Sequence, residues 1–176
     1  MFASQGLAAA SVSAVIEETG LSRGTFYRHF DDLNDAFVAV RQEAVERAYH
    51  VVAAAVALEE HPIRKLRAGI RAFLSIVATH GDLARVFLRE APPSVRHKEQ
   101  LHRATIQRFV DVLQAGLERA HANGMMTTLP SELTIYALIV AMEGIAVRYL
   151  EAHEEHLALE AERVLVDLCV RAFKSE

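Results

Sequence analysis

The residues whose types suggest a chemical role are concentrated in the segment SVSAVIEETGLSRGTFYRHF, at positions 11–30. Its second half contains a group of hydrogen-bonding side chains and one glycine: Arg23, Gly24, Thr25, Tyr27, Arg28 and His29. A guanidinium group can form bidentate hydrogen bonds with guanine, and hydroxyl groups donate to phosphate oxygens. These residue types favour contact with a nucleic acid. From the residue types alone, an ordinary solvated helix surface is the alternative.

Two short helices are predicted to position these residues. Ser11 is a preferred N-cap residue for a helix over residues 12–19, which ends at Gly20, a residue type preferred directly after a helix. Ser22 caps a second helix that ends at about His29. Only a two-residue turn separates the helices, so the pattern predicts a helix-turn-helix whose second helix is short enough to lie in a DNA major groove.

The aromatic residues of the segment predict the orientation of the second helix. Phe26 and Phe30 are four residues apart and therefore share one helix face. We expect this face to pack against Val15 and Leu21. The polar side chains are then left on the outer face.

The same residues carry a family resemblance. The string GLSRGTFYRHF closely resembles the recognition-helix signature of the TetR family of bacterial transcriptional regulators, and ASVSAVIEETG resembles the helix before it. The resemblance is dense over residues 2–30 and is limited to helical architecture in the rest of the chain. It implies an Ω-shaped homodimer that contacts double-stranded operator DNA through the helix-turn-helix, with a ligand pocket in the larger domain that controls DNA affinity.

The resemblance also implies a role for each matching residue. Ser11 is expected to cap its helix and to reach a phosphate. Arg23 and Gly24 match positions near base edges, and Arg28 serves either a base or a phosphate. The phosphate and groove-wall contacts are Thr25, Tyr27 and His29. The complete predicted DNA-binding set is Ser11, Ser22, Arg23, Gly24, Thr25, Tyr27, Arg28 and His29.

Two departures from the family pattern concern DNA affinity. The family usually has a Lys or Arg about three residues after Phe30, where this chain has the run DDLN at positions 31–34. Residues 1–6 align with the end of the family's first helix, so we expect most of that helix to be missing. Residues 1–47 contain four arginines and seven acidic residues, a balance of −3. These features predict weak operator binding with a shallow salt dependence. Adding about 10 to 15 upstream residues is expected to restore the operator affinity.

The composition and the residues that begin and end helices predict an all-α fold. The 176 residues are 52% hydrophobic and 24% charged, and only four are proline and eight glycine. Six further helices are predicted at about residues 33–58, 62–80, 82–90, 98–122, 132–152 and 157–173. We expect residues 1–47 to form the DNA-binding domain and residues 48–176 a larger helical domain.

The three- and four-residue spacing of apolar residues predicts which helix faces are buried. In the helix at 33–58 the expected stripe is Phe37, Val40, Ala44, Val45, Ala48 and Val52. In the helix at 98–122 it is Leu101, Thr105, Phe109, Val112, Leu113 and Leu117. Gly81 is expected to end the helix that Pro62 begins.

A partner subunit is predicted from the segment ALIVAMEGIA at positions 137–146, which is apolar nearly all round. Such a helix must be covered on every side, and in a short chain a second copy is the expected cover. We therefore expect a homodimer in which the two C-terminal helices of each subunit form a four-helix bundle. The alternative is that this helix is the centre of a monomeric core.

An apolar ligand pocket is predicted between the helices that begin at Pro62, Lys98 and Ser131. Its expected lining consists of bulky or adaptable residues and one carboxylate: Phe73, Phe87, Phe109, Met142 and Glu143. Filling of an ordinary core explains the same residues equally well.

The remaining features argue against other classes of protein. We expect no membrane span, no secretory signal and a cytoplasmic location, in agreement with the single cysteine, Cys169. No catalytic set is visible, and His153 and His156 are expected to lie in a solvated loop rather than to bind a metal. The sequence also implies no cofactor.

Three functions from different classes follow. The favoured one is a ligand-responsive repressor, which a small, largely apolar effector releases from a palindromic operator. The second is a helical homodimer that binds a small apolar molecule or a protein without binding DNA. The third, an enzyme, is disfavoured.

Overall fold

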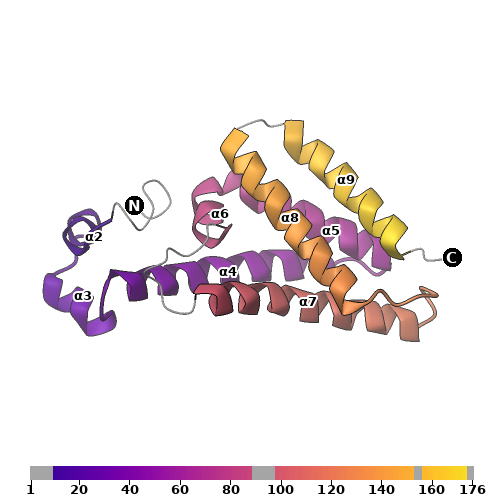
Figure 1. The fold of residues 1–176 in the computed structure, drawn as a ribbon, viewed down its shortest axis with the longest axis horizontal. Helices are drawn as coiled ribbons and strands as arrows, with labels where there is room; N and C mark the ends of the chain where they lie inside the picture. The colour runs from indigo at the N-terminus through magenta and orange to yellow at the C-terminus, as the bar shows by residue number, and fades with distance from the viewer. Residues whose placement is uncertain (1–9, 89–97, 153–155, 174–176) are drawn as a thin grey trace.

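The computed structural model describes residues 10–88, 98–152 and 156–173, and these residues contain eight helices and no strand (Figure 1). The helices are α2 (Val12–Thr19), α3 (Arg23–His29), α4 (Leu33–Ala57), α5 (Pro62–Thr79), α6 (Gly81–Leu88), α7 (Lys98–Ala122), α8 (Glu132–Ala152) and α9 (His156–Phe173). The all-α prediction is confirmed. Residues 1–9, on which the expectation about the first helix rests, lie outside the described residues.

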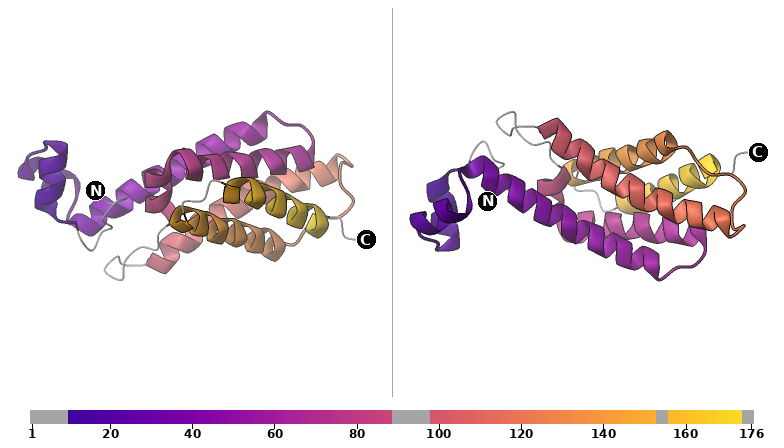
Figure 2. Two further views of the ribbon diagram at one scale, coloured as in Figure 1. Left: turned by 90° about the horizontal axis from the view of Figure 1, so that it is seen from above. Right: turned by 90° about the horizontal axis from the view of Figure 1, so that it is seen from below.

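Helix α4 joins two parts of the molecule. Helices α2 and α3 form a small module at one end of α4, and the other end of α4 packs within the bundle of α5 to α9 (Figures 1 and 2). Its 25 residues make it about 37 Å long. The helix continues without a break past residue 47, so the predicted boundary between domains falls inside it. Movement of the bundle end of α4 can therefore change the position of the module.

The local signals that were predicted to begin and end the helices are present. Ser11, Ser22 and Ser131 each accept a hydrogen bond from the backbone N–H three residues later, at 3.1, 3.0 and 3.2 Å. Gly20 and Gly124 both have φ of 68°, a left-handed conformation that favours glycine after a helix. These contacts are local, which is why the sequence predicts them well.

Gly81 has a different role from the one predicted. Helix α5 ends at Thr79, and Gly81 is the first residue of α6. His80 connects the two helices, because its backbone N–H donates to the carbonyl of Ile76 at 2.8 Å and its carbonyl accepts from the N–H of Ala84 at 2.9 Å. The prediction was wrong because these hydrogen bonds satisfy the backbone groups at the joint, so no left-handed glycine is required.

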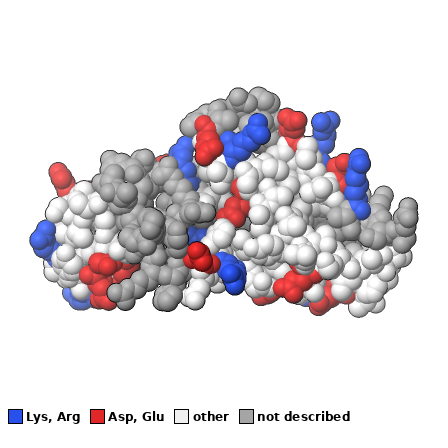
Figure 3. Space-filling view, viewed as in Figure 1, with Lys and Arg blue, Asp and Glu red and all other residues white. Residues whose placement is uncertain are grey.

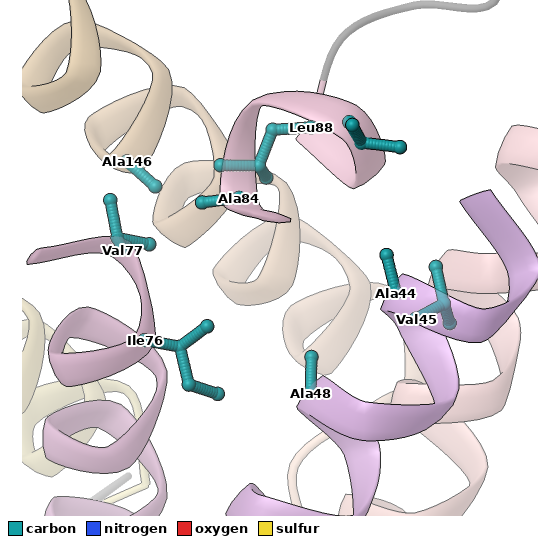
Figure 4. Close-up of a cluster of buried hydrophobic side chains, with 9 residues drawn as sticks. Ala44, Val45, Ala48, Ile76, Val77, Ala84, Leu88 and Ala146 are labelled. Carbon is teal, nitrogen blue, oxygen red and sulfur yellow. The ribbon is translucent and has the colours of Figure 1, made fainter. Parts of the chain in front are cut away.

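Small residues form the centre of the bundle. One buried cluster contains Ala44 and Ala48 of α4, Val77 of α5, Ala84 of α6 and Ala146 of α8, and all of these are at most 2% exposed (Figure 4). Short side chains allow the helix backbones to approach closely. Two further clusters join α5 to α8 and α9, and α7 to α8.

The cluster that joins α5 to α8 and α9 contains Cys169, whose side chain is buried. Burial raises the pKa of its thiol from 9.0 to about 12. Because the folded pKa is raised, the thiol stays protonated at pH 8. Its contribution to the free energy of unfolding is lost as the pH rises above about 9.

We therefore expect native Cys169 to react with a maleimide at pH 8 on the order of 100-fold more slowly than the urea-unfolded chain. Mass spectrometry at timed intervals measures both rates. Similar rates for the native and unfolded chains would contradict the burial of this thiol.

The predicted buried face of α4 is largely confirmed, because Phe37, Ala44, Val45 and Ala48 are buried. Val40 is 41% exposed instead, and Arg41, which was not predicted to be buried, is 2% exposed. In α7, Leu117 is buried as predicted, but Val112 is exposed, whereas Ile106 and Val110 are buried. Contact of α4 with α5 and α6, and of α7 with α8, determines which residues beside each apolar stripe are covered.

Candidate nucleic-acid interface

The recognition helix α3 is anchored by one aromatic side chain. Phe26 is 1% exposed, and its ring lies 5.4 Å from that of Phe30 and 5.3 Å from the edge-on ring of Tyr27. The prediction that Phe26 faces inward is confirmed, and Val15 and Phe30 are half-buried. Leu21 was expected in the same core but is exposed. It lies in the turn, outside the face that the two phenylalanines share.

The anchored face leaves the predicted DNA-binding residues on the outside of the module. Arg23, Tyr27, Arg28 and His29 are exposed, and Thr25 is half-buried. Ser11, Ser22 and Gly24 are also exposed. The structure thus brings all eight predicted residues onto α3 and the two N-caps without burying any of them. Their contact with DNA stays a prediction.

Hydrogen bonds within the module fix the start of α3. Ser22 Oγ accepts from the backbone N–H of Thr25 at 3.0 Å and lies 2.9 Å from Thr25 Oγ1. Arg23 Nη2 donates to Ser13 Oγ of α2 at 3.1 Å. Arg23 must exchange this serine for a base acceptor if it is to bind guanine, whereas Ser22 and Thr25 organise the helix end.

The acidic run after Phe30 has a structural role that the sequence analysis missed. Asp32 is the N-cap of α4, where its Oδ1 accepts from the backbone N–H of Asp35 at 2.8 Å. In return, Asp35 Oδ2 accepts from the N–H of Asp31 at 3.2 Å. The three-residue spacing of Asp32 and Asp35 resembles a capping box and was a signal in the sequence.

The charge on the module is mixed. Of the four arginines within residues 10–47, Arg41 is buried and Arg47 pairs with Glu43 at 2.8 Å, which leaves Arg23 and Arg28 at the candidate interface. In the face shown in Figure 3, acidic and basic side chains are interspersed over α2 and α3. Few phosphates can be neutralised by such a surface, so the expectation of a shallow salt dependence stands.

A pocket of about 530 Å³ lies between α4 and α7. The residues that line it are Ala39, Arg41, Gln42, Glu43, Val45, Glu46, Leu101, Ala104, Thr105 and Arg108. Two of these lining residues form an ion pair, in which Arg108 Nη2 donates to Glu46 Oε2 at 2.6 Å. The Arg108 guanidinium also lies 4.2 Å from the ring centre of Tyr49. The hydrogen bond lowers the pKa of the Glu46 carboxyl.

Of the five residues predicted to form a ligand pocket, the four whose side chains are described do not line this one. Phe73 and Phe109 pack against the central cluster, and Met142 packs against the cluster of α5, α8 and α9. The side chain of Phe87 lies outside the described residues. Glu143 lies 3.5 Å from His102 Nε2 and acts electrostatically on Arg41. The predicted pocket between α5, α7 and α8 stays a prediction.

The residue that sequence analysis missed in this region is Arg41. It is the one charged residue among the buried residues that the structure describes. Burial lowers the pKa of its guanidinium, and the carboxylate of Glu143 acts in the opposite direction. An arginine four residues after Phe37 and four before Val45 was the available signal, because all three share a helix face.

An apolar surface is formed by one side of α8 and α9. The exposed residues are Leu133, Tyr136 and Val140 on α8 and Val164 and Leu168 on α9. Figure 3 shows few charged side chains over the middle of α8. By length and composition alone, α8 could also cross a membrane. The core helices of soluble proteins meet the same criteria of length and composition.

Comparison with family models identifies both parts of the chain. Residues 1–40 match the model "Bacterial regulatory proteins, tetR family", and residues 59–150 match "Tetracyclin repressor-like, C-terminal domain". The chain belongs to the TetR family. Members of the TetR family are DNA-binding transcriptional regulators that are generally not enzymes, so the chain is a DNA-binding regulator. The resemblance seen in the recognition helix is confirmed.

Solved structures of other bacterial regulators share the fold. The fatty acid degradation regulator FadR from Bacillus halodurans is 15% identical, with a TM-score of 0.83 over 99% of this chain and 91% of that one. FadR from Bacillus subtilis in complex with stearoyl-CoA is 15% identical, with a TM-score of 0.79 over 95% and 90%. A TetR-like regulator from Rhodococcus sp. RHA1 is 21% identical, with a TM-score of 0.74 over 99% and 90%. A comparison with curated proteins found no match.

His153 and His156 were expected to lie in a solvated loop rather than to bind a metal. His153 lies outside the described residues, as does the side chain of His156. Among the residues that the structure describes, no group of three histidine, cysteine or acidic side chains could hold a metal ion.

Proposed function

We propose that this TetR-family regulator is a cytoplasmic homodimeric repressor that a small effector with an apolar body releases from a palindromic operator. Residues 1–47 act as the DNA-binding domain and residues 48–176 as the ligand-binding and dimerisation domain. The observation that carries the proposal is the recognition helix α3, which precedes α4 in the chain. Its Phe26 is buried, and its hydrogen-bond donors are exposed. Since α4 also lines a pocket, one helix connects the two functions.

Dimerisation is supported by the exposed apolar residues of α8 and α9. Val140 and Leu168 are 40% and 50% exposed, although both are apolar and both lie on long helices. Packing these faces against their symmetry copies would bury them in a four-helix bundle. A symmetric dimer presents two copies of α3, which matches a palindromic operator.

The choice of effector is supported by relatives of the same fold. FadR from Bacillus subtilis was solved with stearoyl-CoA, which has a long apolar chain. We therefore favour an acyl compound as the effector of this chain. To release DNA, the ligand must bind more tightly to a dimer whose subunit spacing fits the operator less well. A ligand with equal affinity for the DNA-binding and the released conformations would not change their populations.

The test of DNA recognition is the substitution Arg28→Ala. The protein first selects a binding site from random duplexes, and fluorescence anisotropy then measures its affinity for that site. We expect affinity to fall about 5- to 150-fold, since one arginine contact contributes roughly 1 to 3 kcal/mol. If Arg28 contacts a base, the preference at one position of each half-site is also relaxed.

Arg47→Ala is the matched control. Arg47 is exposed on α4 and pairs with Glu43, a surface contact that contributes little to stability. Its substitution is expected to leave operator affinity within about twofold. Unchanged affinity in Arg28→Ala would remove this residue from the DNA-binding set. Failure of the wild-type protein to select any duplex would favour a helical homodimer that does not bind DNA.

A further inference from the structure

We propose that the pocket between α4 and α7 is an effector subsite in which Arg41 Nε donates a hydrogen bond to the carbonyl oxygen of an acyl thioester or ester. This inference rests on the proposed function, because it assumes an acyl effector. It adds the location of the subsite, the residue that recognises the acyl group and the preference for an uncharged carbonyl.

The hydrogen bonding of Arg41 is incomplete. Its side chain is 2% exposed and lines the pocket. Nη1 donates to Thr105 Oγ1 at 3.1 Å, but Nε has no acceptor among the described residues. Thr105 Oγ1 in turn donates to the carbonyl of Leu101 at 3.0 Å, so its one proton is already used. A buried N–H without an acceptor is costly, and a ligand oxygen that enters between α4 and α7 and reaches Nε would remove that cost.

The charges around Arg41 favour an uncharged acceptor. Glu143 already faces the guanidinium electrostatically, and it lies 3.5 Å from His102 Nε2. The other acidic residues at the pocket, Glu43 and Glu46, are paired with Arg47 and Arg108. A ligand carboxylate would therefore add a further negative charge beside the carboxylates of Glu43, Glu46 and Glu143. A thioester or ester carbonyl accepts the hydrogen bond without adding charge.

The other side chains of the pocket fit the remainder of an acyl compound. Ala39, Val45, Leu101 and Ala104 contribute apolar surface beside Arg41. The volume of about 530 Å³ lies within the range of small-molecule sites. Arg108, which is half-buried and lies over Tyr49, forms a polar end of the same pocket.

The subsite lies on the helix that carries the recognition module. Arg41 and Thr105 connect α4 to α7 through one hydrogen bond, and Arg41 comes 12 to 30 residues after the members of the DNA-binding set in the sequence. A carbonyl bound at Nε would insert between these helices and move α4 relative to α7. Ligand binding and operator release should then change together, as thermodynamic linkage requires.

Arg41→Lys tests the assignment, because lysine keeps the positive charge that faces Glu143 but has no guanidinium Nε–H. Isothermal titration calorimetry measures the affinity of the wild-type and variant proteins for decanoyl-CoA, decanoate and free CoA. We expect the wild type to bind decanoyl-CoA more tightly than decanoate or CoA. We expect Arg41→Lys to weaken decanoyl-CoA binding about 10- to 100-fold. Operator release by decanoyl-CoA should weaken by a similar factor.

Arg71→Lys is the matched control. Arg71 forms a hydrogen-bonded pair with Glu162 outside the pocket, at 2.7 Å, and its substitution should leave decanoyl-CoA affinity unchanged. Thermal unfolding without ligand verifies that Arg41→Lys is folded, and Arg41→Met provides a second variant without any charge. Loss of the ligand-induced rise in Tm in both Arg41 variants would support the assignment.

The outcomes separate this inference from the proposed function. Unchanged decanoyl-CoA affinity in Arg41→Lys would overturn the role of Arg41. Equal wild-type affinity for decanoate would overturn the preference for an uncharged carbonyl. If the wild type binds none of the three probes, the acyl subsite is wrong. Sequence-selective operator binding by the same preparation would still support a DNA-binding repressor.

Discussion

Replacing Val140 by glutamate is expected to convert the protein from a dimer into a monomer. Val140 is 40% exposed on the apolar side of α8, where Tyr136 and Leu133 are about one and two helical turns away. At a two-fold interface, the substitution would bring two carboxylates into an apolar contact without partners. Each desolvated charge costs several kcal/mol, so the dimer dissociation constant should rise by at least about 100-fold.

Sedimentation velocity at micromolar concentration measures this change, and Val51→Glu is the control. Val51 is 50% exposed on α4 and receives the same charge on a different surface. The control should remain a dimer. Operator affinity should fall only in Val140→Glu, because a monomer contacts one half-site at a time. A Val140→Glu protein that stays dimeric would place the subunit interface elsewhere.

The second large effect is expected from Phe26→Ala, which should unfold the helix-turn-helix. Phe26 is the one fully buried side chain of α3, and no described residue of α2 is buried. The module therefore depends on this ring and its contacts with Tyr27 and Phe30. Loss of a buried phenylalanine side chain costs about 3 to 5 kcal/mol, which a module with so small a core cannot offset.

The bundle should be unaffected, because its clusters involve α4 to α9 only. Hydrogen exchange should show loss of protection over residues 12–29 with protection retained in α5 and α8. Operator binding should be lost as well. Tyr27→Phe is the control for hydrogen exchange alone, since it keeps the aromatic ring and removes only the hydroxyl of an exposed residue. Full protection of α3 in Phe26→Ala would show that other contacts hold the module.

Sequence by itself determined the helices and the candidate DNA-binding surface. The bounds of α2, α3 and α7 agree with the prediction, because serine caps and left-handed glycines act through hydrogen bonds that span three or four residues. The orientation of α3 was also predictable, because Phe26 and Phe30 are four residues apart and therefore lie on the same helix face. In α2 and α3, the capping residues and the aromatic spacing therefore agree with the tertiary structure.

Only the tertiary structure decided where the buried faces of the long helices depart from the apolar stripes of the sequence. Helix α4 has apolar residues on several sides, and contact with α5 and α6 leaves Val40 exposed while Arg41 is covered. Periodicity cannot distinguish such faces, because each residue step rotates a helix by only about 100°. The burial of Arg41 with an unpartnered Nε likewise depends on α7 and α8, whose positions no local signal in α4 specifies.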